Sequence, residues 1–324
     1  MICIGIEGTA HSFSTGVVKE DGKILSCVTD MYKSEEGGMI PNEVGKHHRE
    51  VCDRVFEKAL EEAGIKEEDI DMISFSQSPG LAPALLVVLD FAKEKAKVLN
   101  VPLVGVNHIV AHLEVGKLVT EAKDPVFVFI SGANTQIIAL EGGKYRIFGE
   151  TLDIGLGNAL DKFGRDAGLG FPAGPKIEEL AKKGEYVELP YSVKGMDVCF
   201  SGIITRAKQL LDKGEKLEDV CYSLQETLFA MVVEVTERAM AHCDKKEALV
   251  IGGVAANKRF SEMLDIMCKE RNAKAYATPL KYCGDNGAMI AWQGILEKKK
   301  ANKNYENFDF DPRLRVDQLD VDWE

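Results

Sequence analysis

Hydrophobic residues in the first part of the chain come in short runs separated by turn residues. Apolar runs cover residues 2–6, a second stretch through Val17-Val18 and residues 24–28, and Gly8-Thr9 and Asp21-Gly22 lie between them. This spacing predicts three consecutive antiparallel strands. The first run has no basic residues ahead of it, so it fits a buried strand and not a signal peptide.

Helical spacing follows the third predicted strand. Apolar residues recur three and four apart between residues 47 and 63, and Gly64 closes the segment. A buried strand is expected at 70–75, and Ser78-Pro79-Gly80 then interrupts the pattern. A helix at 85–99 and a strand at 103–106 complete this half of the chain.

The second half repeats this order. Strands are predicted at 126–130, 136–140 and 145–148, with turns between them, followed by a helix at 223–242 and a strand at 248–251. A further helix is expected to open at the glycine turn 252–257. A strand-turn-strand-turn-strand unit written twice predicts an α/β protein of two lobes, 1–120 and 121–298. Residues 299–324 are charged, and we expect them to form a linker or loosely packed tail.

Composition narrows the class of protein. The 324 residues are 45% hydrophobic, which is enough for a full core, and no apolar stretch is long enough to span a membrane. The eight cysteines have no paired spacing, which favours a reducing, cytoplasmic compartment. A net charge of −12 would repel nucleic acid, so an RNA substrate would need a local basic patch or a partner protein.

Two polar hairpin turns and one glycine turn are candidates for binding phosphate and adenosine. Exposed backbone N–H groups in such turns can solvate a phosphate, although most turns of this kind are only hairpins. The third turn, at 252–257, joins a strand to a helix, where close backbone approach suits an adenosine. The first turn offers Glu7, Thr9 and His11, and the second offers Ser131, Gly132, Ala133 and Asn134.

The order of these motifs resembles a known family. The matching segments include GIEGTAHS from residue 5, GVNHIVAH from 105, SGANTQ from 131, GETLDIGLGNALDKFGRD from 149 and GGVAANKR from 252. They are similar to the tRNA threonylcarbamoyladenosine biosynthesis family, in its archaeal and eukaryotic branch, whose members work inside the KEOPS assembly. The resemblance implies a duplicated fold of the actin, sugar-kinase and heat-shock chaperone type, with a nucleotide cleft between the lobes.

A metal site is implied by the same resemblance. His108 and His112 are four residues apart in a segment that becomes helical after a strand, so both imidazoles would lie on one face. Such a pair alone is more often structural than metal-binding. The resemblance adds Asp285, expected from the other lobe, and this donor set suits iron better than zinc. An older description of the family as a metallo-endopeptidase is disfavoured, because Ile109 replaces the glutamate of a zincin helix.

One expected metal ligand is missing. Family members usually carry a tyrosine before the second phosphate turn, and this chain has Phe129 there, which cannot coordinate a metal. Ala133 also replaces a common glycine of the turn. We expect a site with one fewer protein ligand.

The donor-binding residues also follow from the resemblance. Without the resemblance, Asp161 and Glu178 are best interpreted as solvent-exposed carboxylates on helices, because most Asp and Glu side chains are exposed. The resemblance places them with Gly174 and Asn257 around the adenosine of an adenine nucleotide, either threonylcarbamoyl-AMP or ATP. It adds the segment before and through the second turn, namely Phe129, Ile130, Ser131, Gly132, Ala133 and Asn134.

The implied activity is transfer of a threonylcarbamoyl group to tRNA. Its implied partners are tRNA and KEOPS subunits, including a small atypical protein kinase and a dimerising subunit. No general base can be named from the sequence, although His11 and Glu7 are candidates. Two alternatives stay open: an ATP-dependent small-molecule kinase of the same fold, and a nucleotide-responsive scaffold without chemistry of its own. In some archaeal relatives the kinase follows on the same polypeptide.

Overall fold

A computed structural model describes residues 1–33 and 40–323. Contacts between residues divide the chain into two units. Unit 1 joins Met1–Leu118 to the segment that begins at Gly284, and unit 2 is Val119–Cys283. The first boundary lies close to the expected one at residue 120. The second differs, because residues 284–298 were expected in the second lobe and instead pack with the first.

The sheet of unit 1 is mixed. Its strands are β1 (Ile2–Glu7), β2 (Ser12–Lys19), β3 (Ile24–Met31), β4 (Met72–Ser78) and β5 (Leu103–Asn107), in the order β3-β2-β1-β4-β5. The first three pair antiparallel, and β1, β4 and β5 pair parallel. The three predicted antiparallel strands and the two later ones are confirmed.

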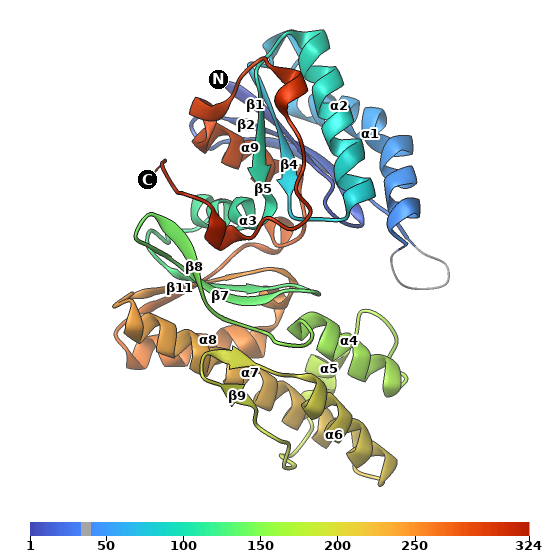
Figure 1. Cartoon of the computed structure of the whole chain (residues 1–324). Coiled ribbons are helices and arrows are strands. Elements are labelled where there is room, and N and C mark those ends of the chain that lie inside the picture. The colour runs from blue at the N-terminus through green and yellow to red at the C-terminus, as the bar shows by residue number, and fades with distance from the viewer. Residues whose placement is uncertain (34–39, 324) are drawn as a thin grey trace. The chain divides into compact units, whose positions relative to one another are not determined.

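Helices cover both faces of this sheet (Figure 1). Helices α1 (Pro41–Ala63) and α2 (Ala82–Leu99) pack against the face that presents Ile4 and Ile6. Helix α9 (Gly287–Leu296) packs against the face that presents Gly5, and α3 (His108–Leu118) lies beside α9. Helix α1 begins earlier than predicted, because Pro41 is well suited to a first helical turn.

Glycines allow α9 to approach β1 and β2 closely. A Cβ on Gly5 would lie 2.1 Å from Ala291 N, and one on Gly16 would lie 2.2 Å from Ala288 N. A Cβ on Gly287 would lie 2.2 Å from Gly16 N. The helix backbone therefore rests directly on the strand backbones, which fixes the start of α9 within unit 1.

The expectation of a loose tail at 299–324 is wrong for the residues that the structure describes. Tyr305, Phe308 and Phe310 pack against the core of unit 1. The hydroxyl of Tyr305 donates to the carbonyls of Ala96 and Val101, at 3.1 and 2.9 Å. The segment contains the short helices η4 (Lys298–Lys300), η5 (Tyr305–Asn307) and η6 (Val316–Gln318). Its aromatic residues, which the charge pattern obscured, account for this packing.

Unit 2 repeats the sheet of unit 1. Its strands are β6 (Val126–Ile130), β7 (Thr135–Glu141), β8 (Lys144–Glu150), β11 (Glu247–Ile251) and β12 (Lys274–Ala277). Their order is β12-β11-β6-β7-β8. Read from β8, this is the third, second, first, fourth and fifth strand of the unit, as in unit 1, so the predicted duplication is confirmed.

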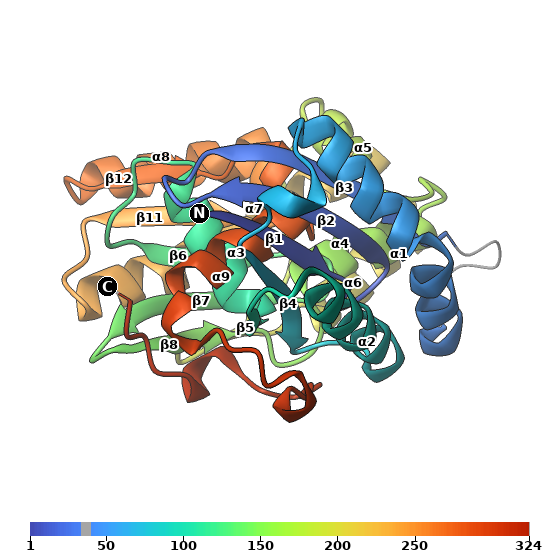
Figure 2. The same cartoon turned by 90° about the horizontal axis from the view of Figure 1, so that it is seen from above.

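Helix α7 (Leu217–His242) packs against β6–β8. Helix α8 (Lys258–Glu270) packs against β12, and Figure 2 shows the two side by side. Helices α5 (Gly174–Ala181) and α6 (Ser201–Asp212) pack against α7, and α4 (Leu156–Asp166) packs against α5 and α6. The short strands β9 (Val193–Lys194) and β10 (Asp197–Val198) form a separate hairpin. The glycine turn 252–257 contains one 3-10 turn, η2 (Gly253–Ala256), and the α-helix begins only at Lys258. No helix in the described part of the chain is long and apolar enough to cross a membrane.

Candidate metal centre and nucleotide-binding residues

His108 and His112 lie on the first turns of α3, directly after β5. The side chain of Asn107 starts this helix: its Oδ1 accepts hydrogen bonds from the backbone N–H groups of Ile109 and Val110, at 2.9 and 3.1 Å. Residues four apart share a helix face, and the two imidazole rings lie 4.7 Å apart. Asn107 was missed in the sequence, although an asparagine directly before a predicted helix is a recognisable start signal.

Asp285 completes a group of three donors. Its Oδ1 lies 3.2 Å from Nε2 of His112 and 3.5 Å from Nε2 of His108. Two ligand atoms bound tetrahedrally to one ion are roughly 3.4 Å apart. One ligand atom from each residue lies within 4.8 Å of the others. The chemistry and the spacing of the three side chains therefore fit a divalent metal ion.

All three donors belong to unit 1. The expectation that Asp285 comes from the other lobe is wrong, because the segment from Gly284 onward packs with Met1–Leu118. The close contacts of Gly5, Gly16 and Gly287 place the loop before α9 beside the start of α3.

Burial and charge act in opposite directions on these three groups. Burial lowers the pKa of His108, but the carboxylates of Glu7 and Asp285 outweigh it and raise the pKa to about 9. Burial also dominates at His112, whose pKa is lowered. Burial would raise the pKa of Asp285, yet the charge of His108 and the hydrogen bond with His112 hold it well below its usual range. Asp285 is therefore ionised and ready to bind a cation.

The first polar turn faces inward at Glu7 and Thr9. Glu7 is fully buried, and its Oε1 accepts hydrogen bonds from Thr9 N and Thr9 Oγ1, both at 2.7 Å. Its Oε2 lies 3.0 Å from Nδ1 of His108. Thr9 is also buried, whereas His11 is half-buried. Glu7 and Thr9 therefore contact the metal group, and a phosphate role for the three residues stays a prediction.

The second polar turn belongs to unit 2. Its carbonyl groups at Ser131 and Gly132 accept hydrogen bonds from the N–H groups of Gly157 and Asn158 at the start of α4, at 3.2 and 2.9 Å. In the described part of the chain, the N–H groups of Gly132 and Ala133 have no hydrogen-bond acceptor, and both residues are exposed. Asn134 N donates to Ser131 Oγ. Two neighbouring backbone donors are thus available to an anion.

Phe129 and Ile130 form the end of β6, just before this turn, and both are buried. Phe129 pairs with Ile251 on one side and Gln136 on the other. Its side chain offers no metal ligand. The predicted loss of a protein ligand thus concerns unit 2, whereas the three donors described above are in unit 1.

The four residues expected around an adenosine lie close together in unit 2. Asp161 Oδ1 accepts a hydrogen bond from Ala173 N, next to Gly174 at the start of α5. Glu178, one turn further along α5, accepts from the backbone N–H that follows Asn257, at 2.9 Å. Asn257 caps α8, accepting from Phe260 N, and its amide donates to Gln225 on α7. Gln225 was missed because no local sequence pattern links residue 225 to this turn.

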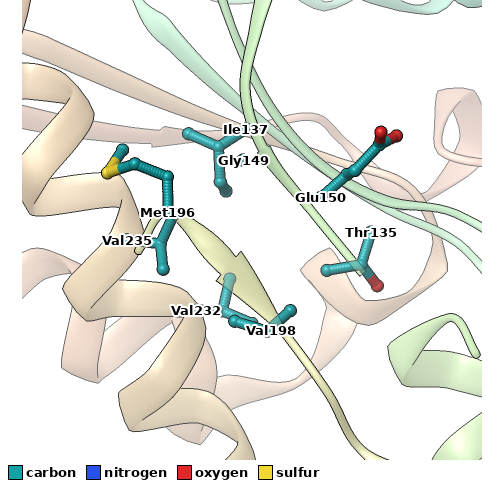
Figure 3. A pocket seen from close by; sticks show the side chains of 8 residues that line it. All are labelled: Thr135, Ile137, Gly149, Glu150, Met196, Val198, Val232 and Val235. Atoms are coloured by element: carbon teal, nitrogen blue, oxygen red, sulfur yellow. The ribbon is translucent and has the colours of Figure 1, made fainter. Parts of the chain in front are cut away.

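The cavity in Figure 3 is not a candidate nucleotide site. It lies in unit 2, between β7, β8, α7 and the β9–β10 hairpin, and its lining includes Ile137, Val232 and Val235. Its volume is about 10 Å³, which holds one water molecule at most. A Cβ on Gly149 would lie 2.0 Å from the carbonyl oxygen of Met196, so glycine permits this close packing.

Solved structures resemble the fold at low sequence identity. The HypF protein of T. kodakarensis matches with a TM-score of 0.62 at 16% identity, over 91% of this chain and 47% of that one. Component A of (R)-2-hydroxyglutaryl-CoA dehydratase from Acidaminococcus fermentans matches with a TM-score of 0.57 at 13% identity, over 93% and 100%. These likenesses establish the actin-like α/β fold, with two mixed five-stranded sheets.

Sequence relatives are much closer. A protein of Thermococcus sibiricus described as tRNA N6-adenosine threonylcarbamoyltransferase is 52% identical over the full length of both chains. One from Archaeoglobus fulgidus with the same description is also 52% identical over both full lengths. A probable bifunctional tRNA threonylcarbamoyladenosine biosynthesis protein of Methanobrevibacter smithii is 50% identical, and this chain spans 60% of its length. The family model described as TsaD, tRNA N6-adenosine threonylcarbamoyltransferase, matches residues 23–292. The chain therefore belongs to the tRNA N6-adenosine threonylcarbamoyltransferase family.

Proposed function

We propose that the protein transfers the threonylcarbamoyl group of threonylcarbamoyl-AMP to tRNA. The acceptor is the exocyclic amine of the adenosine 3′ to the anticodon, in tRNAs that read codons beginning with A. The amine nitrogen forms a bond to the carbamoyl carbon, the bond from that carbon to the phosphate oxygen breaks, AMP leaves, and the amine loses a proton. The observation that carries the proposal is membership of the family across residues 23–292.

Residues of unit 2 are proposed to hold the adenylate. Asp161 and Glu178 each use one carboxylate oxygen within the protein, which leaves the second oxygen for a ribose hydroxyl. The N–H groups of Gly132 and Ala133 would bind a phosphate oxygen, because they are neighbouring, exposed donors. This arrangement supports the proposed adenosine role of Gly174 and Asn257, which lie next to these contacts.

Residues of unit 1 are proposed to hold one divalent ion, with iron preferred to zinc because two imidazoles and one carboxylate leave several positions open. The ligands would be His108, His112 and Asp285. When bound, the ion would orient oxygen atoms of the donor and offset negative charge in the transition state. Glu7 is a poor candidate for the general base, since both of its oxygens are already occupied by Thr9 and His108. His11 stays a candidate, because it is half-buried in the same turn.

The proposed partners are tRNA and the other KEOPS subunits, including a small atypical kinase and a dimerising subunit, in the cytoplasm. The net charge of −12 supports a need for partners, because an acidic surface repels the phosphate backbone of RNA. Several bifunctional relatives are longer than this chain, which is consistent with a second activity on the same polypeptide in those proteins.

A reconstituted transfer assay tests the proposal. Purified protein, partner subunits, a donor synthase and tRNA would be incubated with labelled threonine or bicarbonate, and the label in tRNA would be counted. We expect incorporation with the wild-type protein and a loss of about 100-fold with Asp285→Asn, which removes the carboxylate charge from the metal group. No incorporation above a control without this protein would refute the proposal. Undiminished incorporation with Asp285→Asn would favour the scaffold alternative.

A further inference from the structure

A fully buried carboxylate contacts the three-donor group of His108, His112 and Asp285 on the side of His108. Glu7, at the end of β1, has no exposed surface and does not share an ion pair with any lysine or arginine among the described residues. A buried carboxylate without a cationic partner is costly. Its partner here is His108, whose Nδ1 lies 3.0 Å from Glu7 Oε2. This pairing differs from the phosphate-binding and general-base roles that the sequence suggested for Glu7.

The contact divides the two nitrogens of His108 between two carboxylates. Nδ1 faces Glu7, and Nε2 faces Asp285 at 3.5 Å. A bound ion would take the place of the Nε2 proton of His108, so Nδ1 would keep its proton and donate it to Glu7, and the lone pair of Nε2 would point toward the three-donor group. A carboxylate behind a ligating histidine fixes its tautomer and ring orientation in this way, and it makes the ligand nitrogen more basic.

Thr9 holds Glu7 in this position. Its backbone N–H and its hydroxyl both donate to Glu7 Oε1 at 2.7 Å, and its Oγ1 lies 3.2 Å from Nδ1 of His108. The preceding N–H, of Gly8, donates to Ser76 Oγ at 3.1 Å on the neighbouring strand β4. The N–H and the hydroxyl of Thr9, which could have bound a phosphate, are therefore used to orient a side chain inside unit 1.

The charges of the cluster match a divalent ion. With an ion bound, both imidazoles would be neutral, and Glu7 and Asp285 would contribute two negative charges, so a dication would balance the group. Removing the charge of Glu7 would leave one uncompensated positive charge when the ion is bound. Glu7 therefore contributes to metal affinity through charge as well as through orientation.

We propose that Glu7, held by Thr9, is a positioning residue that orients and polarises His108 as a metal ligand. The proposal rests on the metal group and not on the transfer reaction. A protein that binds the ion but transfers nothing to tRNA would leave it standing, and would instead refute the proposed function.

Metal titration of the full-length protein tests this role. Metal-free wild type, Glu7→Gln, Thr9→Val and Ser26→Ala would be titrated with Zn²⁺ against a chromophoric chelator, and with Co²⁺ while its visible absorption is recorded. Ser26→Ala is the matched control, because its buried hydroxyl donates to Ala59 O in the same unit without contacting the cluster. Thermal unfolding of each variant would report its stability.

We expect Glu7→Gln to weaken binding by about 10- to 100-fold and to change the Co²⁺ spectrum, since the geometry of one ligand changes. Thr9→Val should weaken binding less, and it tests the same contact if Glu7→Gln fails to fold. Ser26→Ala should bind the ion as the wild type does. Unchanged affinity and spectrum in folded Glu7→Gln, or in Thr9→Val when Glu7→Gln does not fold, would overturn the proposal, as would a wild type that binds neither ion.

Discussion

His48 is a buried side chain that can ionise, so its environment in the fold affects stability. It lies on α1 with no exposed surface, and its ring packs edge-on against Phe13 at 5.4 Å. Neither ring nitrogen makes a hydrogen bond of ordinary geometry with the described residues. Burial, followed by the nearby charge of His47, lowers the pKa of His48 to about 4. The folded protein therefore keeps this imidazole neutral.

This neutral state predicts a loss of stability in acid. Below pH 6.5 the unfolded chain binds a proton at His48 that the folded chain does not, so stability falls as the pH falls toward 4. The difference between 6.5 and about 4 corresponds to about 3 kcal/mol. His48→Leu should remove this part of the pH dependence, with little loss at pH 7.5. Urea unfolding of both proteins between pH 7.5 and 4.5 measures it, and parallel curves would contradict it.

At the same scale, the sequence predicted the members of the three-donor group better than it predicted their hydrogen-bond partners. Helical spacing placed His108 and His112 on one face, the resemblance added Asp285, and the structure brings the three together. The pairing of Glu7 with His108 joins residues far apart in the chain, so no local pattern contains it. The contact of Glu178 with the N–H after Asn257 was invisible for the same reason. The sequence therefore indicated which residues form the three-donor group, whereas it did not indicate hydrogen bonds between distant segments of the chain.

At the scale of elements, the position of α9 depends on glycines, which have no side chain at its contact with β1 and β2. Three glycines let its first turns rest on β1 and β2, and Asp285 precedes this contact by two residues. The sequence predicted most strands and helices because their periodicity is local. It predicted neither α9 nor its packing in the first unit, since a hydrophobic pattern does not record the close approach of two backbones.

Gly16→Ala should therefore damage both stability and metal binding. The added Cβ would lie 2.2 Å from Ala288 N, a backbone atom that cannot move alone. We expect a loss of about 3 kcal/mol in the free energy of unfolding and about 10-fold weaker metal binding, because the loop of Asp285 shifts with α9. Gly202→Ala is the control, since nothing lies within 4 Å of its Cβ on α6. Urea unfolding and Zn²⁺ titration measure both effects. Equal stability of the two variants would contradict this account.

At the scale of the whole molecule, each unit has its own sheet and its own hydrophobic core. The duplication was predicted because the same order of runs and turns occurs twice along the chain. The packing of residues 299–323 was not, because overall charge concealed the spaced aromatic residues that cover the core of unit 1. The expected nucleotide cleft between the lobes stays a prediction.

The C-terminal segment should therefore be part of the cooperative fold of unit 1. Phe308 packs against the core there, and its ring meets that of the fully buried Phe75 edge-to-face at 6.0 Å. Phe308→Ala should lower the free energy of unfolding by about 2–3 kcal/mol, less than for a fully buried phenylalanine, because Phe308 is only half-buried. Phe171 is 83% exposed in unit 2, so Phe171→Ala should change stability by less than about 0.5 kcal/mol. Urea unfolding compares the two variants. If both are as stable as the wild type, the segment contributes little to stability, and its packing against unit 1 would not be part of what makes the fold cooperative.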